Sequence, residues 1–365
     1  MIKELGAALI LAATLAISGC NKSNSPASPQ KPAPVRQRWL EGYPSRLIKA
    51  HNDYATKIRT GRRSLTGFES VISTTRTWDP RKTITVAFQG GTPELRSQIV
   101  DAVTPWMQAS AAKFDFKSGG VFREWTNSDT AYTAHVRIAF LAGENGGYWS
   151  AVGRDSVNPP LFKPNEPSMN FEGFTDSLPS DYKAVVLHEF GHALGFEHEH
   201  QNPNANCEAE FRWQDDPGYA QTQDSYKQFI PDSSGRRPGI YTRLEGPLNN
   251  WSQDQIDFNL RKLAFQADLL STAIDKNSIM LYHFDPWMYV DPNTAKCYTP
   301  QENTILSQGD TEAVAKEYPQ DTVVAKATVN VQKNALRQML DNPGLTADIR
   351  SHYSKQLHSL VQLGK

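Results

Sequence analysis

The chain has 365 residues, of which 39% are hydrophobic, and it includes 8 Trp and 16 Phe. This is enough apolar material for a packed core, and the length corresponds to about one or two domains. Thirty-eight Lys and Arg against 39 Asp and Glu give a formal net charge of -1, which argues against nucleic acid as a partner. Three cysteines exclude a disulfide-dense miniprotein, and a mean hydropathy of -0.55 with one long apolar run excludes a multi-span membrane protein.

That apolar run lies at the N-terminus, where Met1-Ile2-Lys3 gives a basic start and residues 7–17 are apolar over the length of a signal peptide. It ends in Ile17-Ser18-Gly19-Cys20, which resembles the bacterial lipobox. The resemblance implies cleavage before Cys20 and lipidation of its thiol. The alternative is an ordinary secretory signal in which Cys20 is incidental. Because Asn21 is not the aspartate associated with inner-membrane retention, we expect a lipid anchor in the outer membrane or at the cell surface of a bacterial cell envelope.

The composition after the signal peptide predicts the domain organisation. Residues 20–45 begin with a run of Ser, Pro, Asn, Lys and Gln that cannot bury surface, so they are predicted to form a flexible tether. Residues 46–77 have mixed helical signals and form an N-terminal extension or a pro-segment. A main domain is expected over residues 78–320. Residues 321–365 are expected to add two amphipathic helices broken at Asn342-Pro343-Gly344.

The first half of the main domain alternates between strand and helix signals. Residues 82–88 alternate and are β-branched, which predicts a strand. Thr92-Pro93 then starts a helix whose apolar residues recur to Met107, with a kink expected at Pro105. Further strands are predicted at residues 135–142, 148–152 and 169–171, and residues 143–147 are predicted to connect two of them as a hairpin.

Three further helices have recognisable ends. Residues 180–196 are predicted to form a helix that stops at Gly195, the residue type most tolerant of a left-handed end. Ser252 followed by Gln255 predicts a capping box that opens a helix to about residue 267. Ser307 followed by Asp310 predicts the same device before residue 318.

The chemistry-bearing motif runs from His188 to His198 and reads HEFGHALGFEH. His188 and His192 are spaced to lie one above the other on a helix, which suits two imidazoles that bind one zinc ion. Gly195 can turn the chain sharply and return His198 to the same ion as a third ligand. A fourth position would then be open to water, as a catalytic zinc requires. The alternative is three histidines that are merely hydrogen-bonded on a polar helix face.

This motif resembles that of the metzincin zinc endopeptidases. Within them it is most similar to the astacins, and the resemblance implies a bacterial astacin-like or matrixin-like branch. The likeness also includes Ser278-Ile279-Met280-Leu281-Tyr282, which is similar to the astacin Met-turn, and residues 148–154, which are similar to the astacin strand that pairs with substrate. By the resemblance, Met280 forms the apolar floor beneath the metal and Tyr282 stabilises the reacting carbonyl. The substrate-binding residues would be Tyr148, Trp149, Ser150 and Ala151.

The order of elements and the resemblance imply an α+β metzincin fold. A twisted, mixed five-stranded sheet with helices would lie above the cleft, and an irregular helical half below it. The expected reaction is hydrolysis of extended protein or peptide substrates at one zinc ion on His188, His192 and His198. The zinc lowers the pKa of water toward about 7, and Glu189 accepts the proton and passes it to the leaving amine. The rival hypothesis is a surface lipoprotein that keeps the zinc but has lost turnover. We expect a monomer.

Several residues depart from the resemblance or have two interpretations. Leu281 replaces a histidine common in astacins, and no cysteine or aspartate switch supports a latent form. Cys207 and Cys297 are expected to form a disulfide that closes a loop of about 90 residues, with two free thiols as the alternative. His200 is expected to be solvated or hydrogen-bonded rather than a further ligand, and Trp149 could be core instead of substrate rim.

Overall fold

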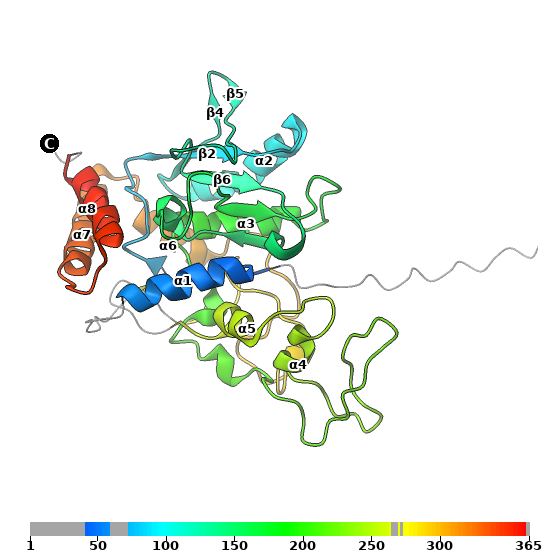
Figure 1. Cartoon of the computed structure of the whole chain (residues 1–365). Coiled ribbons are helices and arrows are strands. Elements are labelled where there is room, and N and C mark those ends of the chain that lie inside the picture. The colour runs from blue at the N-terminus through cyan, green and yellow to red at the C-terminus, as the bar shows by residue number, and fades with distance from the viewer. Residues whose placement is uncertain (1–40, 59–71, 264–268, 271–272, 363–365) are drawn as a thin grey trace, which may run out of the picture. The chain divides into compact units, whose positions relative to one another are not determined.

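The computed structural model describes residues 41–58, 72–263, 269–270 and 273–362, which belong to one compact unit (Figure 1). The predicted signal peptide, Cys20 and most of the predicted tether lie outside the described residues. No helix within the described ranges is both long and apolar enough to cross a membrane.

A mixed five-stranded sheet forms the upper part of this unit, as predicted. Its strand order is β3 (Lys113–Asp115), β2 (Thr83–Phe88), β6 (Val136–Ala139), β8 (Met169–Phe171) and β7 (Tyr148–Ser150). Neighbouring strands are parallel except β7, which runs antiparallel to β8. The expected metzincin sheet is therefore present, with β7 at its edge.

The predicted hairpin at residues 143–147 is wrong. This segment contains a short 3-10 turn, η1 (Gly143–Asn145), but β6 and β7 on either side of it do not pair, because β8 lies between them. All four residues of β6 are buried, so this strand needs a neighbour on each side. β8 comes later in the chain and supplies that second neighbour, an arrangement for which the local sequence has no signal.

Two helices cover the sheet and form the first core with it. α2 (Pro93–Ala109) begins at Thr92, whose side chain accepts a hydrogen bond from the Leu95 amide, and it contains Pro105 as predicted. α3 (Tyr182–Leu194) is the motif helix. The indole of Trp106 on α2 donates a hydrogen bond to the Leu187 carbonyl on α3 at 2.8 Å, so the two helices are joined by a polar contact inside an apolar core.

The N-terminal helix α1 (Ser45–Ile58) packs with the two C-terminal helices in a second core. These are α7 (Thr322–Leu340) and α8 (Ala347–Gln362), which lie side by side in Figure 1. The hydroxyl of Tyr54 donates a hydrogen bond to that of Tyr353 at 2.8 Å. Trp149 of β7 belongs to the same cluster. Segments from both ends of the described chain therefore meet behind the edge strand.

The lower half has short helices and long irregular connections around a third core that includes both Cys207 and Cys297. Here α5 (Gln253–Leu260) ends earlier than predicted, with Arg261 in an extended conformation as its C-cap. Ser252 caps α5, but no reciprocal hydrogen bond of a capping box closes it; the Gln255 side chain instead contacts Ser45 and Tyr43. The box at Ser307 and Asp310 is complete.

The remaining elements are short or lie at the periphery of these cores. Their bounds are α4 (Ile240–Glu245), α6 (Gln308–Glu317), β1 (Ile72–Ser73) paired with β9 (Leu269–Leu270), β4 (Lys117–Ser118) paired with β5 (Val121–Phe122), and the 3-10 turns η2 (Gly153–Val157), η3 (Glu199–Gln201), η4 (Cys207–Ala209) and η5 (Pro286–Met288).

Candidate active site

The helix α3 and the turn that follows it bring three histidines to one point. His188 and His192 lie one turn apart on α3, and Gly195 ends the helix in the left-handed region, with φ of 107°. His198 then returns so that its Nε2 lies 3.0 Å from Nε2 of His192. One ligand atom from each of the three histidines lies within 4.8 Å of the other two. The geometry required of a three-histidine metal site is therefore present.

The hydrogen bonds of the three rings fit a metal. Each Nδ1 has an oxygen partner: the Ile279 carbonyl at 2.8 Å for His188, the Phe196 carbonyl at 2.7 Å for His192, and the Gln201 side chain at 2.9 Å for His198. When Nδ1 carries the proton, Nε2 has a free lone pair, which is the form that binds zinc. The Nε2 of His188 is buried and has no other partner among the described groups. These residues fit one zinc ion.

Burial also keeps the three rings neutral. It lowers the pKa of His192 to about 4 and those of His188 and His198 well below the ordinary value. Neutral imidazole is the form that donates a lone pair to a metal.

Glu189 lies beside the first histidine on α3 and is 1% exposed. Its Oε2 is buried without a hydrogen-bond partner among the described groups. Burial, and then the charge of Glu41, raises the pKa of Glu189 well above its ordinary value. A buried carboxylate with a spare oxygen next to the metal ligands can accept a proton.

The predicted Met-turn places Met280 against α3 and Tyr282 against two of the histidines. Met280 is buried against Gly191 of α3, at which any Cβ would collide with the Met280 sulfur. The ring of Tyr282 stacks on that of His188, with centroids 4.9 Å apart and an interplanar angle of 17°. Met280 therefore packs on the motif helix and Tyr282 on a histidine of the cluster, as their predicted roles require.

The edge strand β7 lies where a substrate strand was expected, but a segment of the chain itself runs along it. Glu41 forms a parallel bridge with Tyr148, and the Gly42 amide donates a hydrogen bond to the Tyr148 carbonyl at 3.0 Å. The Tyr43 hydroxyl donates to the Ser150 carbonyl at 2.7 Å. Sequence reasoning missed these contacts, because no motif around residue 41 indicates them.

The side chains of the predicted substrate strand face different surroundings. Tyr148 is half-buried, whereas Trp149 is 2% exposed and packs in the second core. Ser150 and Ala151 are also buried. The ring of Trp149 therefore belongs to the core, and the outer edge of β7 is formed by the carbonyls of Tyr148 and Ser150.

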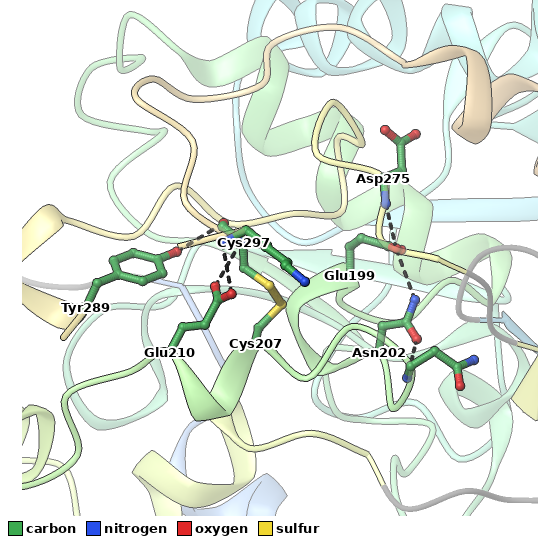
Figure 2. Close-up of a disulfide and its surroundings, with 9 residues drawn as sticks. Glu199, Asn202, Cys207, Glu210, Asp275, Tyr289 and Cys297 are labelled. Atoms are coloured by element: carbon green, nitrogen blue, oxygen red, sulfur yellow. Dashed lines mark hydrogen bonds between the residues drawn. A yellow bond between two sulfur atoms is a disulfide. The ribbon is translucent and has the colours of Figure 1, made fainter. Parts of the chain in front are cut away.

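His200 and Glu199 are buried below the three histidines. The Nε2 of His200 lies 3.0 Å from the Asn259 carbonyl, which agrees with the hydrogen-bonded role expected for it. The carboxylate of Glu199 accepts hydrogen bonds from the Asn202 side chain at 3.2 Å and the Asp275 amide at 3.1 Å (Figure 2). Burial raises the pKa of Glu199 to about 7. Neither residue contributes a ligand atom to the three-histidine cluster.

Cys207 and Cys297 form a disulfide, with Cα atoms 5.6 Å apart (Figure 2). The Glu210 carboxylate accepts hydrogen bonds from the amides of Lys296 and Cys297, both at 2.9 Å. The Tyr289 hydroxyl donates to the Cys297 carbonyl at 3.1 Å. The bridge thus joins two irregular segments of the lower half that are also held by side chains.

Comparisons with known proteins agree with this geometry. The family model for Astacin (Peptidase family M12A) matches residues 70–228. The zinc metalloproteinase dpy-31 of Brugia malayi is 26% identical over 167 residues, which are 46% of this chain. The match spans 23% of that relative, so the chain corresponds to about a quarter of its length. The structure of myroilysin aligns with a TM-score of 0.51 and 26% identity over 69% of this chain and 100% of that chain.

The sheet, the histidine geometry and these matches together define an astacin-like metzincin. Its three-histidine cluster is the site for one catalytic zinc ion.

Proposed function

We propose that the protein is a zinc-dependent endopeptidase that hydrolyses extended protein or peptide substrates. The observation that carries this proposal is the convergence of one ring nitrogen from each of three histidines, with the buried carboxyl group of Glu189 next to His188 in the motif helix. When bound, zinc would supply Lewis-acid chemistry, which makes water nucleophilic near neutral pH and polarises a carbonyl. His188, His192 and His198 would hold it.

The chain's own side chains would then move the protons. Glu189 accepts a proton from the attacking water and delivers it to the leaving amine. Tyr282, positioned by its stacking on His188, donates a hydrogen bond to the carbonyl oxygen as negative charge develops there. Once residues 41–43 have left it, the outer edge of β7 binds an extended substrate by strand addition.

The decisive experiment maps cut sites in a peptide library by mass spectrometry with zinc-loaded protein. We expect cleavage that stops in the Glu189→Gln variant, which should retain its zinc, with a loss of turnover of about two to four powers of ten. His192→Ala should lose the zinc itself in elemental analysis, because two ligands hold the ion weakly. If zinc is bound but neither the wild-type chain nor the Glu41→Ala variant described next cleaves any peptide, the rival hypothesis of an inactive zinc-containing surface lipoprotein is favoured.

Residues 41–43 bind β7, so the end of the predicted tether is not flexible, and we further propose that it acts as an inhibitory segment. Glu41, Gly42 and Tyr43 bind the same edge of β7 that a substrate needs. Burial, and then the charge of Glu41, raises the pKa values of both Glu189 and Tyr282. Glu41→Ala should therefore raise kcat/KM for a peptide relative to wild type. The exposed Lys49→Ala on α1 is the matched control and should leave it unchanged. Equal rates for the Glu41→Ala variant and the wild type would refute the inhibition.

The lipid anchor stays a proposal that rests on Ile17 to Cys20. Intact-mass analysis should find acyl chains on Cys20, and Cys20→Ser should move the protein to the soluble fraction. An unacylated wild-type protein that is released freely would contradict the anchor, and with it the outer-membrane location.

A further inference from the structure

A cavity of about 440 Å³ lies between helix α8 and the segment that follows β7. It shares no lining residue with the three-histidine cluster. Val157, Pro159 and Pro160 form an apolar part of its wall. The polar part of the wall consists of Tyr132, Arg154, Asp348, His352, Lys355 and Gln356.

Arg154 is the unusual member of this wall. Burial lowers the pKa of Arg154 to about 10, so its guanidinium is still cationic at neutral pH. Arg154 is half-buried as a whole, but its Nε is fully buried and has no hydrogen-bond partner among the described groups. The neighbouring Arg76, by contrast, pairs with Asp155 and Glu197. The charge of Asp79 acts on Arg154 from a distance, but the buried Nε still lacks a hydrogen-bond acceptor, which an oxyanion in the cavity could supply.

The other charges of the wall add to this positive field. Burial, and then the charges of Arg154 and Lys355, lower the pKa of His352 to about 3, so His352 is neutral. Asp348 is the single acid among the lining residues, and its Oδ1 accepts a hydrogen bond from Thr346 at the start of α8. Two cations therefore face one carboxylate that is already hydrogen-bonded.

Gln356 leaves a second polar atom without a partner at the same place. The residue is 3% exposed, its Nε2 lies 2.5 Å from Nε2 of His352, and its Oε1 is buried with no hydrogen-bond partner among the described groups. An occupant with a hydroxyl or amide group could donate to this oxygen. The prolines and Val157 would contact a short apolar portion of the same molecule.

We propose that this cavity is a binding site for a small oxyanion, with a carboxylate or a phosphate held by Arg154. Oxyanions match the planar guanidinium with charge-assisted hydrogen bonds, which are stronger than neutral ones. A bound oxyanion would also join α8 to the segment after β7. The site is separate from the proposed peptidase centre and does not depend on turnover.

The test uses thermal unfolding of the zinc-loaded full chain in Tris chloride, with sodium phosphate or sodium succinate added at matched ionic strength. We expect phosphate or succinate to raise the Tm of the wild-type protein in a saturable manner, and the arm that does so identifies the ligand class. Arg154→Gln should remove this rise and weaken binding, measured by calorimetry, about tenfold or more. Without oxyanion the same variant should melt at or above the wild-type Tm, because the substitution removes a cation whose buried Nε has no acceptor among the described groups.

Lys326→Gln is the matched control, since Lys326 is exposed on α7 and does not line the cavity. It removes one positive charge and should keep the full response to the oxyanion. The proposal is overturned if neither phosphate nor succinate raises the wild-type Tm more than chloride, or if the Arg154→Gln variant responds as the wild type does. A lower Tm of that variant in chloride alone would also count against it.

Discussion

Asp310 holds the backbone of Ile279, whose amide donates a hydrogen bond to the Asp310 carboxylate at 2.8 Å. The Ser278 hydroxyl donates to the same carboxylate at 2.6 Å. The carbonyl of Ile279 in turn accepts the hydrogen bond of His188 Nδ1. A carboxylate on α6 therefore orients a metal ligand through the Met-turn, and this relay leads to the first prediction.

We expect Asp310→Ala to weaken zinc binding about ten- to a hundredfold, because outer partners of metal ligands contribute to affinity at this scale. The measurement is competition with a zinc chelator at a temperature where circular dichroism shows the variant to be folded. Glu312→Ala, exposed on the same helix, is the control. If the folded Asp310→Ala variant binds zinc as tightly as wild type, Asp310 caps α6 but does not contribute to zinc affinity.

The second prediction concerns Tyr282. Tyr282→Phe keeps the ring that stacks on His188 and loses only the hydroxyl. It should lower kcat about ten- to a thousandfold, with KM little altered, because the hydrogen bond is made as charge develops on the carbonyl oxygen. Peptide hydrolysis at the wild-type rate would show that the tyrosine is structural.

The third prediction uses Glu317, which is 6% exposed on α6. Burial raises the pKa of Glu317 from its ordinary value of 4.5 to about 7. The folded state then binds more protons than the unfolded state between these values, so stability is lost as the pH rises through 7. Glu317→Gln removes this dependence. The free energy of unfolding of the variant, relative to that of wild type, should therefore rise by up to about 3 kcal/mol from pH 5 to pH 8.

Urea unfolding of both proteins at the two pH values measures this difference. Glu312→Gln should change the stability equally at pH 5 and pH 8. A difference between the Glu317→Gln variant and wild type that does not depend on pH would mean that Glu317 is not protonated in the folded state at pH 5.

The fourth prediction is that the disulfide stabilises the lower half. Its two cysteines are separated by 90 residues in sequence. In the chain-entropy model a loop of this size contributes up to about 4 to 5 kcal/mol. Cys207→Ala with Cys297→Ala should lower the free energy of unfolding by several kcal/mol, measured in urea. Equal stability of the double variant and the oxidised wild type would contradict this.

The motif helix and its histidines could be predicted because their signals are local. The spacing of His188 and His192 follows from the helical repeat, and Gly195 marks the turn that returns His198. Strand order could not be predicted in the same way, since β8 enters the sheet between two strands that precede it in the chain.

The contacts of the N-terminal segment were also beyond local reasoning. Tyr43 and Ser150 are 107 positions apart, and neither has a neighbouring pattern that indicates the other. Gln255 illustrates the same limit, because a residue with the right spacing for a capping box directs its side chain to Tyr43 and Ser45 instead. Local patterns identify which residues can cap or pair, whereas the distant partner depends on tertiary packing.

The packing of α1 has a kinetic consequence. Residues 41–43 can leave β7 completely only if the chain beside them moves, and α1 begins two residues later with Leu47 and Ile48 almost fully buried. Burial of one such side chain is worth about 2 kcal/mol, so detaching the start of α1 would leave the open form at well under about one per cent. The cleft would then become accessible only through this local unfolding event, and hydrogen exchange at the Gly42 amide would report the free energy of the opening.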